Sequence, residues 1–172
     1  MNDINKTGTR VIAKSLPLSL YILATIFATL LLSHQQLIVG TVVNLMLLTG
    51  AVNLKKNQLL PLAIFPSILA VFQGLLFGKF TFFLLYFLPF IWISNLVYMT
   101  VFKKTKGNGV YRLLISSFGK TAILFITAVL FTNILLVPKI FLTAMGVLQL
   151  VTSLLGGGLF LIINKLEKNN VR

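Results

Sequence analysis

The chain has 172 residues, of which 58% are hydrophobic and only 10% are charged, and its formal net charge is +13. Soluble domains carry about 25% charged residues, so this composition and a mean hydropathy of +1.00 exclude a soluble domain and indicate a multi-pass membrane protein. Without cysteine, and with one histidine and two acidic residues, the chain lacks the ligands for most metal sites and for disulfides.

Six apolar segments follow one another and predict an all-α membrane protein, a compact bundle of six transmembrane helices. Each segment is close to the length of about 20 residues that crosses a bilayer as a helix. We expect a basic N-terminal segment at residues 1–14, the transmembrane domain at residues 15–163 and a polar tail at residues 164–172. The expected helices cover about residues 16–32, 37–54, 58–77, 80–102, 111–137 and 140–163.

The first segment starts with Ser15 and Pro17, and a proline suits the first turn of a helix because its missing amide would be unpaired there. The segment carries Ala24 and Ala28, four residues apart and therefore on one helix face. Small residues at this spacing let another helix approach closely. This face either docks a partner protein or packs within the bundle.

Four other segments each carry an amide side chain inside an apolar run: Asn44, Gln73, Asn95 and Gln149. A buried amide is costly unless it is hydrogen-bonded. These amides either pair with one another and fix the bundle, or line a cavity for a small polar or anionic ligand. Because amides both donate and accept hydrogen bonds, such a cavity would suit neutral heterocycles as well as acids.

The fifth segment holds one full charge, Lys120. An ammonium group deep in a membrane costs at least about 2.5 kcal/mol and marks a candidate functional site. The only acidic residues are Asp3 and Glu167, near the two ends of the chain. Lys120 therefore extends to an aqueous surface, meets amide and carbonyl dipoles, or pairs with an anion from elsewhere. Ser116 and Thr127 share its helix face, which favours a position facing protein or a water-filled cavity.

Basic residues gather on the side of the predicted bundle that carries both chain ends, and only Lys79 and Lys139 fall on the other side. Because short cytoplasmic loops are enriched in lysine and arginine, we place both termini in the cytoplasm of a cell-membrane protein. The charge lies in short loops, so it indicates contact with anionic lipids of the bilayer and not with nucleic acid. The residues on the terminal side are Lys6, Arg10, Lys14, Lys55, Lys56, Lys103, Lys104, Lys106, Arg112, Lys165, Lys168 and Arg172.

The sequence carries no motif for chemistry of its own. It has no G-x-x-x-x-G-K-[ST] nucleotide loop, no nucleophile paired with a base and no intramembrane carboxylate for a proton relay. We therefore expect no enzymatic activity, no cofactor and no metal site.

Several stretches resemble the substrate-binding S-components of energy-coupling factor (ECF) transporters, including a group often mislabelled as iron hydrogenases. The resemblance covers the second to sixth segments, with the Lys120 helix among them. It is carried by VGTVVNLMLLTGAVNLKKNQLLPLAIFPSILAVFQGLLFG at residues 39–78, LPFIWISNLVYMTVF at residues 88–102 and LQLVTSLLGGGL at residues 148–159. A hydrogenase is excluded, because a chain without cysteine cannot hold an iron–sulfur cluster in the usual way.

The resemblance implies a protein that captures a small, vitamin-like molecule from outside. Such a protein works with a membrane scaffold protein and two cytoplasmic ATPases, and Ala24 and Ala28 match the alanine pair that docks on the scaffold. Metal-type S-components use N-terminal histidine ligands, and this chain has only His34, so a metal substrate is not expected.

The resemblance also implies that Asn44, Asn95, Lys120 and Gln149 line or support the ligand site. Known vitamin pockets lie in the outer half of such bundles, whereas Lys120 and Asn95 fall in the predicted inner half. We therefore expect these two residues to brace the bundle beneath a pocket. Gln73 and His34, near the outer helix ends, would lie nearer the ligand.

Two functions remain open from the sequence. The first is a substrate-capturing subunit of an ECF-type importer. The second is a non-transporting membrane scaffold or assembly factor, whose small-residue faces bind partner helices and whose amides hold the bundle together.

Overall fold

The computed structural model describes residues 17–31, 35–73, 78–134 and 137–170, and all regular structure within them is helical. The predicted all-α fold is therefore confirmed for these residues. The helices are α1 (Leu18–Leu31), α2 (Gln36–Asn53), α3 (Leu59–Gln73), α4 (Leu84–Lys104), α5 (Gly109–Ile134), α6 (Ile140–Met145) and α7 (Val147–Asn170). Short 3-10 turns at Lys56–Gln58 and Gly78–Phe83 lead into α3 and α4.

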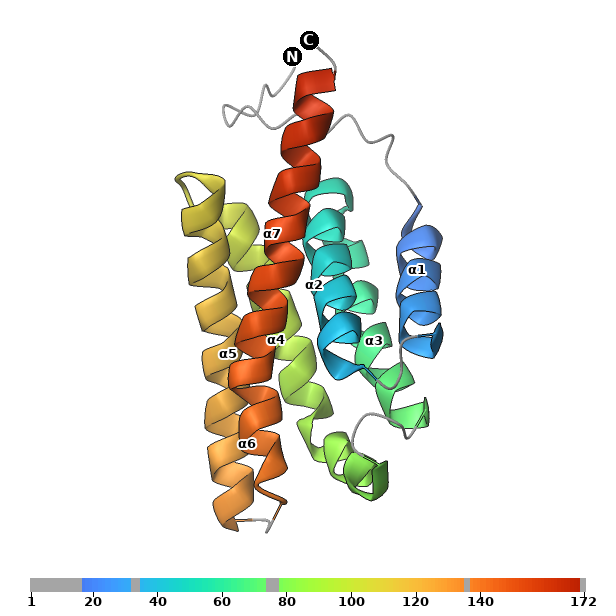
Figure 1. Cartoon of the computed structure of the whole chain (residues 1–172), viewed down its shortest axis with the longest axis vertical. Coiled ribbons are helices and arrows are strands. Elements are labelled where there is room, and N and C mark those ends of the chain that lie inside the picture. The colour runs from blue at the N-terminus through green and yellow to red at the C-terminus, as the bar shows by residue number, and fades with distance from the viewer. Residues whose placement is uncertain (1–16, 32–34, 74–77, 135–136, 171–172) are drawn as a thin grey trace.

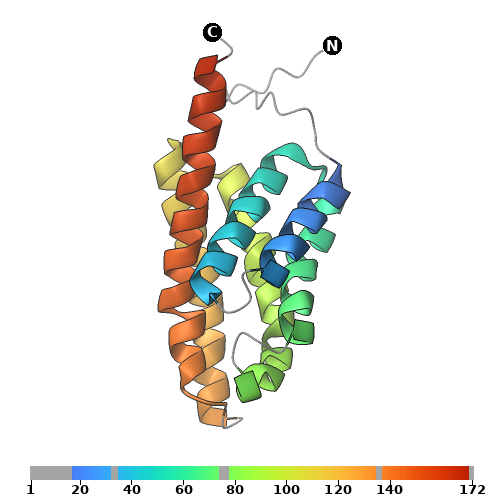
Figure 2. The ribbon, with the colours of Figure 1, turned by 45° about the vertical axis from the view of Figure 1, so that its right-hand side comes forward.

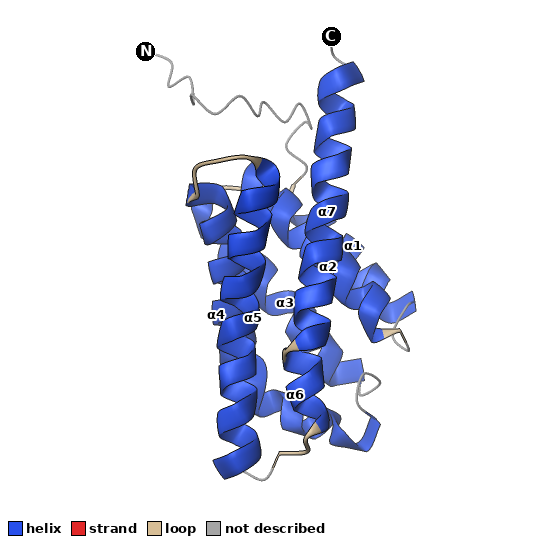
Figure 3. Cartoon of the chain, turned by 60° about the vertical axis from the view of Figure 1, so that its left-hand side comes forward, coloured by secondary structure: helices blue, strands red, loops and turns tan. Residues whose placement is uncertain are grey.

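Helices α1 to α5 run alternately up and down one bundle, and α6 and α7 then run in the same direction as each other (Figure 1). The first residues of α1 and the last residues of α7 lie at the same end, which we call the terminal end. Helix α7 projects beyond the other helices there, as the turned views also show (Figures 2 and 3). Helix α1 packs against α2 and α3 at the side of the bundle.

Among the described residues, four helical stretches are long and apolar enough to cross a membrane: Gln36–Asn53, Phe80–Lys104, Gly109–Ile134 and Ile140–Glu167. The described parts of α1 and α3 have 14 and 15 residues, and a helix of that length spans only about 22 Å of a hydrocarbon core about 30 Å thick. The fold thus agrees with a membrane helical bundle, while the count of six spans stays a prediction.

The last predicted helix, residues 140–163, is two helices that meet at Gly146. This residue leaves the helical conformation, with φ −97° and ψ −98°. A side chain at Gly146 would lie 2.8 Å from the ring of Phe125, so glycine lets the break approach α5 closely. Beyond the break, α7 continues as a helix to Asn170, through most of the stretch predicted as a polar tail.

Helices α2 and α7 form one of the closest helix pairs in the bundle, and glycines make the contact possible. A Cβ atom at Gly156 would meet the Thr41 carbonyl and lie 2.8 Å from the Asn44 Cβ atom. A Cβ atom at Gly157 would lie 2.9 Å from the Tyr98 hydroxyl. Gly156 therefore lets the backbones of α2 and α7 come together, as small residues do in membrane helix pairs, whereas Gly157 faces α4 and α5.

Two apolar clusters divide the interior along the long axis. The terminal cluster includes Leu47, Tyr98, Met99, Phe102 and Phe160. The distal cluster, toward the opposite end, includes Leu84, Phe87, Leu124, Ala128, Phe141 and Met145.

Helices α3, α4 and α5 carry buried polar residues between their contributions to the two clusters. We call Asn44, Asn95, Ser116, Lys120 and Thr152, all buried, the polar layer. It lies near the middle of the bundle because both clusters flank it along α4 and α5.

Candidate functional site

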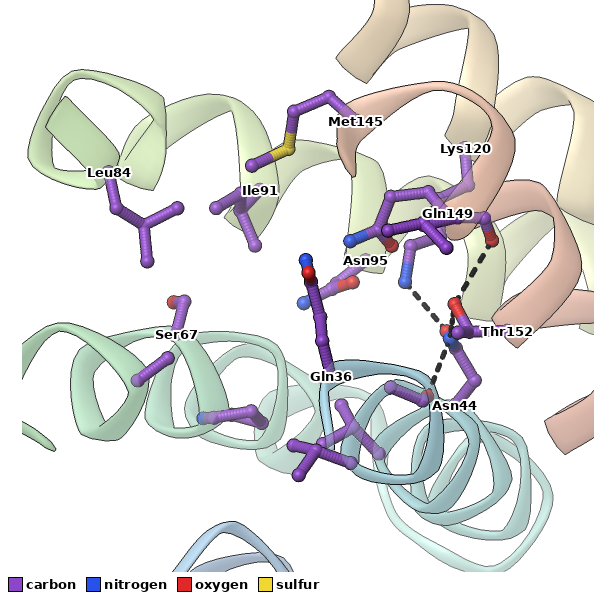
Figure 4. A pocket seen from close by; sticks show the side chains of 16 residues that line it. Gln36, Asn44, Ser67, Leu84, Ile91, Asn95, Lys120, Met145, Gln149 and Thr152 are labelled. Carbon is purple, nitrogen blue, oxygen red and sulfur yellow. Dashed lines mark hydrogen bonds between the residues drawn. The ribbon is translucent and has the colours of Figure 1, made fainter. Parts of the chain in front are cut away.

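A cavity of about 100 Å³ extends from the polar layer toward the distal end of the bundle. Helices α2, α3, α4, α5, α6 and α7 all contribute to its wall (Figure 4). Gln36 and Leu84, the first residues of α2 and α4, line it at the distal side. The lining residues are Gln36, Val39, Gly40, Val43, Asn44, Pro66, Ser67, Ala70, Leu84, Ile91, Asn95, Lys120, Met145, Leu148, Gln149 and Thr152.

Lys120 sits at the floor of this cavity and donates a hydrogen bond from Nζ to Asn44 Oδ1 at 2.6 Å. Only 3% of its side chain is exposed, so the sequence alternative in which it extends to an aqueous surface is wrong. Its Nζ atom also lies 5.3 Å from the centre of the Tyr98 ring, within the range of a cation–π contact. The ammonium group is thus held by one amide oxygen and one ring face.

The Asn44 side chain is fixed in the orientation that serves Lys120. Its Nδ2 atom donates to the Gly40 carbonyl at 2.8 Å and to Thr152 Oγ1 at 3.3 Å. Because both amide hydrogens are used on one side, the oxygen faces the ammonium group. The opposite orientation would direct N–H groups at a cation, so the charge itself favours the observed one.

Asn95 joins α4 to α3 and leaves its oxygen unpaired. Its Nδ2 atom donates to the Ala63 carbonyl at 3.0 Å. The neighbouring carbonyl, that of Leu62, has no partner within its own helix, because Pro66 has no amide N–H to donate to it. Within the described residues, Asn95 Oδ1 has no hydrogen-bond partner although it is buried. A buried acceptor without a donor is uncommon in native structures, and this one belongs to a residue that lines the cavity.

The single tryptophan of the chain lies beside the cavity. Trp92 Nε1 donates to Ser67 Oγ at 2.8 Å, and Ser67 Oγ in turn donates to the Ile64 carbonyl. Ser67 lines the cavity, so the indole of Trp92 is linked through one hydrogen bond to a side chain that would contact a bound ligand.

The structure brings together four of the predicted site residues, Asn44, Asn95, Lys120 and Gln149, around one cavity. Among the described residues no hydrogen bond joins one of these amides to another, so the predicted amide-to-amide pairing is not how they are held. Lys120 and Asn95 line the cavity, and the expectation that they brace the bundle beneath a pocket stays a prediction.

The remaining predicted residues lie away from the cavity or outside the described part. Gln73 is the last residue of α3, and its side chain is outside the described residues, as is all of His34. Ala24 is half-buried on α1, and the side chain of Ala28 is also outside the described residues. Their predicted roles in ligand binding and docking stay predictions.

Sequence reasoning missed Gln36, Thr152 and Tyr98 as parts of the site. Thr152 follows Gln149 by three residues and therefore shares its helix face, which is a signal the sequence carries. Gln36 is the first residue of α2, and the sequence places it in the polar turn before the predicted helix at residues 37–54. Tyr98 stands one turn after Asn95, but only the packing of α4 against α5 brings its ring near Lys120.

Comparisons with protein-family models, with curated proteins and with solved structures find no match to this chain. Its functional assignment therefore depends on the chemistry of the site.

The site is suited to holding a polar molecule. It offers a buried ammonium group, one free amide oxygen and the side chains of Gln36 and Gln149, each able to donate and accept hydrogen bonds. The described residues contain no group of three His, Cys, Asp or Glu side chains that could hold a metal ion.

Proposed function

We propose that this protein is the substrate-capturing membrane subunit of an ECF-type importer. It binds a small, vitamin-like molecule in the central cavity from outside the cell, and it docks on a membrane scaffold protein that works with cytoplasmic ATPases. In this proposal the basic terminal end lies in the cytoplasm, and six helical segments cross the cell membrane.

The observation that carries the proposal is a cavity inside an apolar bundle whose mainly apolar wall includes Lys120 and several amide side chains. Its lining runs from the polar layer toward the distal end and includes Leu84 and Met145 of the distal cluster. No core residue of the terminal cluster lines it. A molecule can therefore approach from the distal side, whereas the terminal cluster closes the other side.

Burial of polar groups at this depth also favours binding over a purely structural role. A polar layer that served only to hold helices together would be expected to satisfy its own hydrogen bonds. Here Asn95 Oδ1 lacks a partner, and Lys120 has a neutral amide where a carboxylate would balance its charge.

The test is recovery of partners from the native membrane. The tagged chain is cross-linked in intact membranes before mild detergent extraction, so that weak docking survives, and the captured proteins are identified by mass spectrometry. We expect a second polytopic membrane protein together with ATPase subunits. Recovery of the chain alone after efficient cross-linking would contradict the importer assignment.

One observation favours the second candidate, a membrane scaffold or assembly factor. The end of α7 projects beyond the bundle (Figure 1). Near this end, the exposed fractions of Ile162 and Leu166 are 57% and 58%. Co-capture of an unrelated enzyme complex, lost when Leu166 is changed to Ser, would establish this function in place of import.

A further inference from the structure

We propose that the molecule bound in the cavity is a small carboxylate that also carries a hydrogen-bond donor. This inference rests on the proposed function, which leaves the class of substrate open. The carboxylate pairs with Lys120, and the donor, an O–H or N–H group, bonds to Asn95 Oδ1.

The first step concerns charge. Glu167 is the only acidic residue among the described residues, and it is exposed on the projecting end of α7, whereas Lys120 is buried in the polar layer. A buried charge is usually paired, because its desolvation is costly. The described residues therefore supply no counter-ion for Lys120, and an anion in the cavity would supply it.

The second step concerns hydrogen bonds. An ammonium group has three N–H donors, and Lys120 uses one of them on Asn44. The Tyr98 ring covers another side of the ammonium group. Lys120 also lines the cavity, so its remaining donors are available to an acceptor there, and a carboxylate oxygen forms the stronger, charge-assisted bond.

The third step concerns Asn95. An amide oxygen accepts hydrogen bonds and cannot donate them, and Asn95 Oδ1 is buried without a donor. The bond from Nδ2 to Ala63 fixes which way the oxygen faces. A ligand that only accepts hydrogen bonds would leave this oxygen unpaired, so the ligand carries a donor as well as its negative charge.

The cavity volume limits the size of the ligand. A dry cavity of about 150 Å³ holds benzene, which has six non-hydrogen atoms, so a cavity of about 100 Å³ suits a compact ligand of at most about six. Hydroxy acids of two or three carbons meet all three requirements.

The experiment compares matched probes on the whole protein in lipid nanodiscs. Lactate carries the charge and a donor, propionate carries the charge alone, and lactamide carries the donor without the charge. Glycolate and glycolamide form a second pair. Binding is followed by thermal unfolding, since a ligand stabilises the folded state by mass action, and by the fluorescence of Trp92.

We expect at least one donor-bearing carboxylate to raise the unfolding temperature and to bind at least about tenfold more tightly than its amide. Lys120→Met abolishes this difference in affinity. Lys120→Arg, which keeps the charge, retains part of the difference and serves as the second variant if Lys120→Met does not fold. Lys139→Met is the matched control, because Lys139 is an exposed lysine outside the cavity. Asn95→Leu weakens lactate binding and leaves propionate binding unchanged.

Two results would overturn the inference. Equal binding of amides and carboxylates, unaffected by Lys120→Met, would show a neutral ligand and leave capture by the cavity intact. Failure of every carboxylate probe to bind the folded wild-type protein would also reject it, and the cross-linking experiment then decides the importer assignment separately.

Discussion

Removing Asn44 is expected to destabilise the bundle mainly because it leaves Lys120 without an acceptor. The Nζ to Oδ1 bond of 2.6 Å joins two side chains that are 3% and 1% exposed. Breaking a buried charge pair by deleting one partner costs about 3–5 kcal/mol, and the neutral amide partner here places Asn44→Leu toward the lower value. Lys120→Met removes the charge and leaves one amide oxygen unpaired, at a cost of about 1–3 kcal/mol.

The double variant separates this bond from the other roles of Asn44. With Met at position 120, Asn44→Leu loses only the bonds to Gly40 and Thr152. We expect the two changes to be coupled by about 2 kcal/mol, the strength of a hydrogen bond to a charged group. The free energy of unfolding is measured for all four proteins in mixed micelles by titration with a denaturing detergent.

The control for the cycle pairs Lys120→Met with Thr49→Val. Thr49 lies farther along α2, where its hydroxyl donates to the Leu45 carbonyl of its own helix, and distant changes add to within about 0.5 kcal/mol. If the effects of Lys120→Met and Asn44→Leu on the free energy of unfolding added as closely as those of the control pair, the hydrogen bond would not hold the ammonium group. The interpretation of the cavity floor would then be wrong.

Two further predictions use the same unfolding measurement. Gly156→Ala is expected to destabilise the protein by about 1–3 kcal/mol, the cost of overpacking, because its Cβ atom would press on the Thr41 carbonyl and the Asn44 side chain. At Gly158 nothing lies within 4 Å of a new Cβ atom, so Gly158→Ala should stabilise the helix by about 0.5–1 kcal/mol; equal effects at the two sites would contradict the close contact. Tyr98→Phe removes the 2.8 Å bond to the Ser153 carbonyl and should cost about 1 kcal/mol while leaving carboxylate binding unchanged, because the ring beside Lys120 remains.

Much of the architecture could be predicted because apolar segment length is a strong signal in membrane proteins. The predicted segments all contain helices, and α2, at Gln36–Asn53, lies within one residue of its predicted bounds of 37–54. The break at Gly146 was not predicted, because an isolated glycine in an apolar run also suits a continuous helix. The projection of α7 to Asn170 was missed because its last residues are polar, and polarity marks the end of a membrane segment but not of a helix.

The composition of the site was predictable for a different reason. Polar side chains in apolar helices cannot remain facing lipid without cost, so Asn44, Gln73, Asn95 and Gln149 were expected either to pair with one another or to line a cavity with Lys120. Four of these five residues line one cavity, and the side chain of Gln73 lies outside the described residues. Which of them would bond to which could not be predicted. That depends on the rotation of each helix about its axis and on its depth, and the close contact at Gly156 fixes both for α2 against α7.

The position of the polar layer explains how one chain can be stable and still keep an unbalanced charge. Aromatic packing in the distal cluster, including the stacked rings of Phe87 and Phe141, and the terminal cluster around Phe102 hold the helices from both sides of the layer. The layer does not need to satisfy every polar group in order to hold the bundle together. Both the amide nitrogen and the amide oxygen of Asn44 form hydrogen bonds, and the oxygen positions Lys120. In Asn95 the amide nitrogen is hydrogen-bonded and the oxygen is not. Both Lys120 and Asn95 line the cavity, so the hydrogen-bonding capacity left over in this layer belongs to residues of the wall that would contact a bound ligand.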